Sequence, residues 1–190
     1  MNRISRGLAL VALGMVLLAA GATAQNGPTL SAQDYLDIRD LIDTYPHRLD
    51  NCTNGGKDYA DLFTDDATFG VSSEWGKAKI WFRGREQLIA AGGGSKDGSC
   101  RPQTGTRSYH LNINPHITPT PSGAHAISTL LTITNDTGTG GDAVHWEGGY
   151  EDTFEKTAKG WRFKSRVHVW PEIEWTDRPE DMPPRNLANE

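Results

Sequence analysis

The first hydrophobic residues of the predicted folded region repeat with helical spacing. They lie on one side of a helix if residues 32–49 are helical: Tyr35, Ile38, Leu41, Ile42, Tyr45 and Leu49. Ser31 can cap the start of this helix, with Asp34 as its capping-box partner. Pro46 lacks a backbone N–H, so we expect it to kink the helix or end it early.

After Gly55 and Gly56 the pattern predicts shorter elements. Tyr59, Leu62 and Phe63 form the apolar edge of a short second helix. Two strands at about 67–71 and 78–83 and a third helix over 84–91 follow, and residues 92–106 form a long loop.

From there on, hydrophobic and polar residues alternate, which is typical of strands with one buried face. We predict strands at 107–118, 125–135, 143–155 and 161–170, joined as antiparallel hairpins by turns rich in Gly, Pro and Asp. Helices followed by a strongly bent antiparallel sheet predict an α+β domain whose three helices cover one face of the sheet.

Both ends of the chain differ from this domain. Arg3 and Arg6 precede an apolar run over 8–20 and the small-residue segment 22–24, which predicts a signal peptide over residues 1–24. An uncleaved membrane anchor is the alternative, but the run is short for a membrane span. We therefore expect a secreted or periplasmic protein that no longer contacts the membrane, with a domain over 25–170. The tail, 171–190, should be extended, with Ile173 and Trp175 docking on the body or on a neighbour.

Composition narrows the class of protein. With 36% hydrophobic and 23% charged residues the chain is neither disordered nor apolar along its length, and its net charge of −5 argues against a nucleic-acid partner. The two cysteines, Cys52 and Cys100, would pair as a disulfide in an oxidising compartment; two buried thiols are the alternative.

The sequence contains no recognisable metal-ligand spacing, nucleophile elbow or dinucleotide fingerprint, so we expect chemistry without a cofactor or metal. A zinc site built from His110, His145 and His168 lacks a supporting acidic or thiol ligand. The informative pair is Asp50, after the first helix, and His110, on the polar face of the first long strand. A carboxylate that is hydrogen-bonded to one imidazole nitrogen makes the other nitrogen a better general base. The alternative is that Asp50 is an ordinary helix-end residue and His110 an ordinary sheet histidine.

Several segments together resemble the SnoaL-like branch of the nuclear transport factor 2-like superfamily. The resemblance covers residues 31–170 and is carried by the segments 37–42, 47–50, 58–69, 82–86, 107–113, 150–154 and 160–163. It implies a cone-shaped curved sheet that encloses a pocket with its helices. It also implies self-association, as a homodimer or homotrimer, through the outer face of the sheet.

Within that superfamily the chain is most similar to the scytalone dehydratase and hexachlorocyclohexane dehydrochlorinase group, and diarylpropane lyases also belong there. The resemblance places that group's catalytic Asp and His on Asp50 and His110. It implies a lyase, of dehydratase, elimination or deformylation type, acting on a small hydrophobic or aromatic substrate. A non-catalytic ligand-binding or assembly module is the alternative. An epoxide-hydrolase-like site, which would need Asp152 as its second acid, is a third reading.

Further candidates surround this pair. We add three residues to the catalytic set: Tyr45, His145 and Arg166. Arg166 would stabilise developing negative charge, or else be a solvated cation on an exposed strand. Five residues are candidates for substrate binding: His47, Asn112, Trp81, Glu147 and Trp146. Six tryptophans and five tyrosines would suit an aromatic-lined pocket, although they also serve as ordinary core residues.

Overall fold

The computed structural model describes residues 27–101, 107–136, 141–172 and 174. The predicted signal peptide and the predicted contacts of Ile173 and Trp175 lie outside these residues. The described elements are α1 (Ala32–Asp50), the 3-10 helix η1 (Thr53–Gly56), α2 (Lys57–Ala60), β1 (Phe63–Ser72), β2 (Lys79–Arg83), α3 (Gly84–Ala91), β3 (Arg107–Thr120), β4 (Gly123–Asp136), β5 (Gly141–Thr157) and β6 (Gly160–Val169). None of the described helices is long and apolar enough to cross a membrane.

Helix α1 begins as the sequence predicts but does not break at Pro46. Ser31 forms the capping box with Asp34, and the helix continues through Pro46 to Asp50. A proline removes the donor that would bond to the carbonyl four residues earlier, here that of Ile42. The side-chain amide of Asn112 on β3 donates to this carbonyl at 3.2 Å instead. The expectation of an early end is wrong because a neighbouring strand supplies the missing donor.

The second helix is shorter than predicted. Helix α2 covers only Lys57–Ala60, and Phe63 is the first residue of β1 rather than part of a helix. Its ring packs in the core against Phe163, with ring centroids 5.2 Å apart, so the apolar edge is shared between a helix and a strand. The third helix has the predicted bounds.

The strands form one curved six-stranded sheet in the order β2-β1-β6-β5-β4-β3. Every neighbouring pair is antiparallel except β1 and β6, which are parallel, so the sheet is mixed rather than purely antiparallel. Hairpin signals reveal only pairs that are adjacent in sequence, and β1 and β6 come from opposite ends of the domain.

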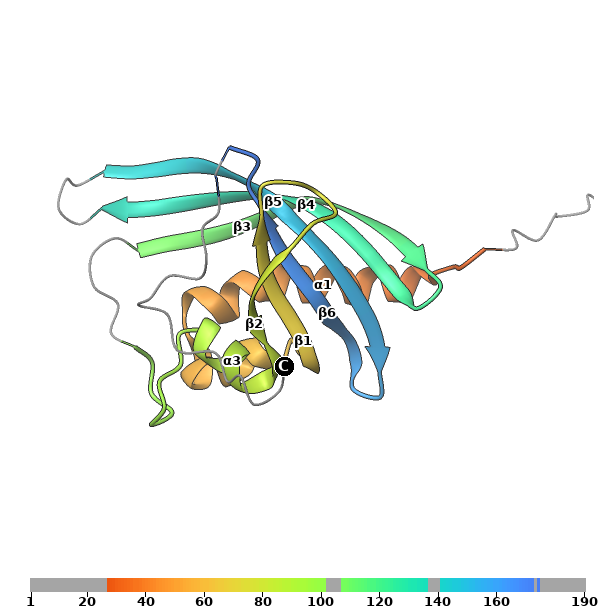
Figure 1. Ribbon diagram of the computed structural model, residues 1–190, viewed down its shortest axis with the longest axis horizontal. Coiled ribbons are helices and arrows are strands. Elements are labelled where there is room, and N and C mark those ends of the chain that lie inside the picture. Colours follow the sequence, from red (N-terminus) through yellow and green to blue (C-terminus); the bar gives the residue numbers. More distant parts are fainter. Residues whose placement is uncertain (1–26, 102–106, 137–140, 173, 175–190) are drawn as a thin grey trace, which may run out of the picture.

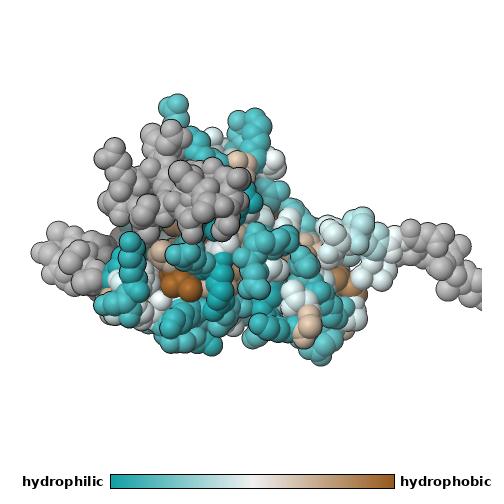
Figure 2. All heavy atoms as spheres, turned by 60° about the horizontal axis from the view of Figure 1, so that its bottom comes forward, coloured by the Kyte–Doolittle hydropathy of each residue, from teal (hydrophilic) through white to brown (hydrophobic). Residues whose placement is uncertain are grey.

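The helices cover one side of the sheet. Figure 1 shows α1 crossing this side, with α3 beside the end of α1 that leads into η1. The core lies between α1 and the sheet, where Ile38, Ile42 and Tyr45 meet Phe154 and Phe163. The face drawn in Figure 2 is mostly hydrophilic, with small separate hydrophobic areas among its described atoms. The α+β expectation is confirmed.

Candidate functional site

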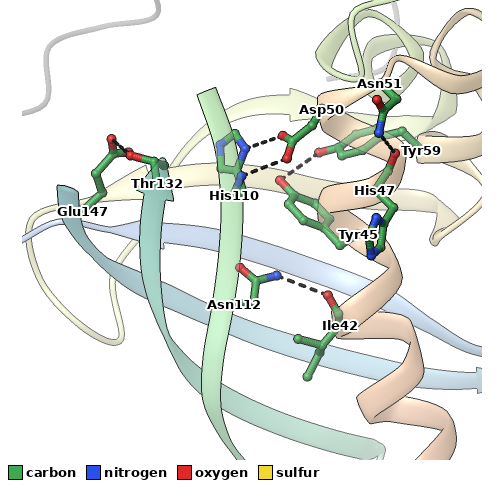
Figure 3. Close-up of polar contacts among 10 residues, drawn as sticks. All are labelled: Ile42, Tyr45, His47, Asp50, Asn51, Tyr59, His110, Asn112, Thr132 and Glu147. Atoms are coloured by element: carbon green, nitrogen blue, oxygen red, sulfur yellow. Dashed lines mark hydrogen bonds and ion pairs between the residues drawn. The ribbon is translucent and has the colours of Figure 1, made fainter. Parts of the chain in front are cut away.

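The last residue of α1 meets the edge strand β3 through two hydrogen bonds (Figure 3). One carboxylate oxygen of Asp50 lies 2.5 Å from Nδ1 of His110, and the other accepts the His110 backbone N–H at 2.8 Å. The Asp50 side chain is 6% exposed and the His110 side chain 22% exposed. A carboxylate that accepts both donors holds the imidazole with its proton on Nδ1, which leaves Nε2 as the proton acceptor.

Two elements bring this pair together. The Asn112 contact with Ile42 joins α1 to β3 a little over two helical turns before Asp50. Asn112 and His110 are two residues apart on β3, so both point to the helix-covered face. The amide nitrogen of Asn112, a predicted substrate ligand, is therefore engaged by the helix, and the residue is buried.

A row of polar side chains continues from His110 across the same face of the sheet. Thr132 is the register partner of His110 on β4 and donates its hydroxyl to a Glu147 carboxylate oxygen at 2.7 Å. The backbone carbonyl of Glu147 lies 2.7 Å from Nε2 of His168 on β6. Burial lowers the pKa of His168, which favours its neutral form. The row thus places a carboxylate and a second imidazole beside the dyad.

Thr132 is not among the predicted site residues, and His168 enters the predictions only as a zinc ligand. The signal that could have found Thr132 is the pairing of β3 with β4 across a short turn. His168 and Arg166 are two residues apart on the same strand, so their side chains point to the same side of the sheet.

Arg166 lies in the core beneath this row. Its guanidinium is 3.7 Å from the ring centroid of Tyr45 and 3.8 Å from that of Tyr150. Its ion-pair partner is Asp152, at 3.4 Å, and both side chains are 0% exposed. The reading of Arg166 as a solvated surface cation is therefore wrong: β6 is a central strand whose inner face is covered by α1.

Burial also shifts the pKa values of Asp152 and of the neighbouring Tyr45. Desolvation raises the pKa of Asp152 to about 6, against the opposing effect of the Arg166 charge. Tyr45 is 1% exposed, and its pKa is raised well above the ordinary value, mainly by burial. Tyr45 therefore contacts Arg166 through its ring as a neutral side chain.

The remaining predicted site residues differ in their exposure and in the side of the sheet to which they point. His47 is exposed on α1, and Trp81 is 7% exposed in the core. His145 is exposed, and its Nε2 lies 3.0 Å from the hydroxyl of Thr134. Trp146 is 47% exposed and points to the outer face of the sheet. Among the described residues, no group of three or more His, Cys, Asp or Glu side chains is arranged to hold a metal ion.

The predicted disulfide joins Cys52, directly after α1, to Cys100, with Cα atoms 6.0 Å apart. It links the end of the helix that carries Asp50 to the loop that follows α3. The helix terminus that presents the carboxylate is therefore covalently tied to a second segment of the chain.

A protein-family model described as a SnoaL-like domain matches residues 31–167. The chain belongs to this family. The matched region of the SnoaL-like domain includes both Asp50 and His110 and ends within β6. No curated protein matches the sequence significantly.

Solved structures of similar fold come from several bacteria. An NTF2-like protein with a cystatin-like fold from Novosphingobium aromaticivorans is 22% identical, with a TM-score of 0.55 over 75% of this chain and 84% of that one. ActVI-ORFA from Streptomyces coelicolor is 18% identical, with a TM-score of 0.57 over 73% and 98%. Aln2 from another Streptomyces species is 18% identical, with a TM-score of 0.57 over 75% and 94%. At these identities the similarity establishes the fold, which is that of the NTF2-like superfamily.

Proposed function

We propose that this SnoaL-like domain is an exported, cofactor-independent lyase that uses His110 as its general base and Asp50 to orient it. The observation that carries the proposal is the 2.5 Å contact between the Asp50 carboxylate and Nδ1 of His110. A base oriented in this way needs no bound group to remove a proton from a substrate.

The proposed reaction begins with proton transfer to the imidazole. Nε2 of His110 takes a proton from a carbon or a hydroxyl of the substrate. If the proton comes from carbon, the electron pair of the broken C–H bond forms a C=C double bond. A halide or hydroxyl on the neighbouring carbon leaves with its own bonding pair, and a departing hydroxyl takes the proton from the imidazolium and leaves as water. If it comes from a hydroxyl, a carbonyl forms as the adjacent C–C bond breaks. The electron pair of that bond stays on the departing carbon, which takes up the proton from the imidazolium, or it expels a leaving group from the next carbon. In both cases the imidazolium that forms is stabilised by the Asp50 carboxylate.

The substrate we propose is a small hydrophobic or aromatic molecule that carries a hydroxyl. Glu147 lies on the same face as His110 and offers a carboxylate to such a group, held in place by the hydroxyl of the buried Thr132 (Figure 3). The aromatic part of the proposal rests on the resemblance to the dehydratase and diarylpropane lyase group.

The test is turnover of lignin-derived diaryl compounds and hydroxylated polyketides by the purified, full-length protein and by His110→Gln. We expect the variant to lose turnover and keep its fold. His116→Gln is the matched control, because His116 is an exposed histidine on the same strand. Equal turnover in the parent and His110→Gln would overturn the proposal.

The second candidate is a non-catalytic binding module, and one contact favours it. Asp50 also accepts the backbone N–H of His110, which lies on an edge strand, so the carboxylate has a structural use independent of catalysis. In that case a compound from the same panel would bind to the parent and to His110→Gln with similar affinity and would not be converted by either.

Export and self-association complete the proposal. The predicted signal peptide and the disulfide both suit an oxidising compartment. We propose that a second copy packs on the outer face of the sheet. Large apolar side chains exposed there include Tyr109 at 40%, Leu111 at 39%, Val144 at 66% and Trp146 at 47%. These residues, which we call the outer patch, lie on two strands of the sheet, β3 and β5, that flank β4.

A further inference from the structure

The backbone that follows Asp50 is held in an unusual conformation. Cys52 has a φ of 44° and Asn54 a φ of 53°, both in the left-handed region that non-glycine residues avoid. This conformation is less favourable for a residue with a side chain, so surrounding contacts must hold it. Two such residues within four positions of Asp50 mean that the end of α1 depends on its neighbours for its conformation.

Those neighbours belong to the loop after α3. We call the contact between residues 52–56 and 92–100 the glycine seam, because glycines let the two backbones touch. A Cβ added to Gly55 would lie 2.1 Å from the carbonyl oxygen of Gly98, and one added to Gly94 would lie 2.2 Å from the carbonyl oxygen of Gly55. Gly94 and Cys100 also form a β-bridge within the loop. The seam therefore fits in one relative position of the two segments.

The disulfide closes the seam at its point nearest the dyad. Cys52 is two residues from Asp50, and its backbone N–H donates to the Leu49 carbonyl at 3.2 Å, so its position is coupled directly to the last helical turn. Asp50 in turn uses both carboxylate oxygens on His110. A shift of the helix end would lengthen both hydrogen bonds at once.

We propose that the Cys52–Cys100 disulfide is a positioning element that keeps the Asp50 carboxylate on His110. This inference deepens the proposed function but rests on the contact rather than on the reaction. When the bond is broken, the left-handed residues relax, the seam opens, and Asp50 moves away from His110 while the sheet stays folded.

The experiment compares oxidised protein with protein reduced under native conditions, where the exposed Cys100 side of the bond is accessible. Hydrogen exchange of the His110 backbone amide is the readout, because this amide donates to Asp50. We expect its exchange to rise at least tenfold on reduction, while the amides of Asp152 and Arg166 in the central strands keep theirs. The low-field proton resonance of His110 Nδ1–H should broaden or disappear in the same sample.

A double variant, Cys52→Ala with Cys100→Ser, repeats the test without reductant. Val169→Ala is the matched control, because Val169 is 0% exposed in β6 and its truncation destabilises the fold away from the seam. If reduced protein keeps the His110 amide protected, or if all amides lose protection together, the positioning role is overturned. Neither outcome depends on turnover, so failure here is distinct from failure of the His110→Gln test.

Discussion

Among the individual side chains, Asp50 accepts two hydrogen bonds from His110, one on each carboxylate oxygen. A side-chain amide has only one oxygen and can accept only one of them well. Asp50→Asn presents one acceptor and one donor, so either the His110 N–H or Nδ1–H loses its partner, and the wrong tautomer is favoured. We expect turnover to fall by about 10²-fold or more, the usual contribution of a positioned general base. Steady-state rates on any converted compound check this, with Asp43→Asn, an exposed carboxylate on the same helix, as control.

Asp152 makes a separate contribution through its pKa of about 6 in the folded state, against 3.8 as its ordinary value. Between these values the folded protein binds more protons than the unfolded chain, so stability falls as pH rises from about 4 to about 6. This difference corresponds to about 3 kcal/mol for the one group.

The measurement is urea unfolding at pH 4 and pH 7 for the parent and for Asp152→Asn. Asn cannot titrate, so the variant should lack this part of the pH dependence. An equal pH dependence in both proteins would show that Asp152 has an ordinary pKa.

Between elements, the contact of Asn112 with Ile42 joins α1 to β3 at the helix turn that Pro46 leaves without a donor. Asn112→Leu leaves this buried carbonyl without a partner and should cost about 1–3 kcal/mol in unfolding free energy. Pro46→Ala restores a backbone donor to the same carbonyl.

A double-mutant cycle tests this relation. The cost of Asn112→Leu should be smaller in a Pro46→Ala background than in the parent, because the helix then satisfies its own carbonyl. Denaturant unfolding of the four proteins gives the coupling. Strictly additive costs would mean that the Asn112 amide does not replace the missing donor.

For the molecule as a whole, the outer patch predicts association. Trp146→Glu places a charge in the middle of the patch, so we expect the assembly to dissociate to monomer at concentrations where the parent remains associated. Light scattering after size exclusion checks the mass. Leu36→Glu is the matched control, because Leu36 is 63% exposed on α1, outside the patch. A monomeric parent would remove the basis for the interface.

Much of the fold and part of the site were predictable from local sequence. The capping box at Ser31, the third helix over 84–91 and the four long strands depend on residues near one another in the chain, and all are present. Asp50 and His110 were paired by the order of motifs in a family resemblance. Spacing alone did not join them, because they lie 60 residues apart.

Other features arise only when distant segments meet. The parallel pairing of β1 with β6, the packing of Arg166 under Tyr45 of α1 and the continuation of α1 through Pro46 each depend on a partner far along the chain. Local patterns report which face of an element is apolar and where it can turn. Tertiary packing decides which donor reaches a backbone carbonyl that lacks its helical partner, and which acid lies beside a buried cation. Burial enforces these pairings, because a buried polar group without a partner costs free energy.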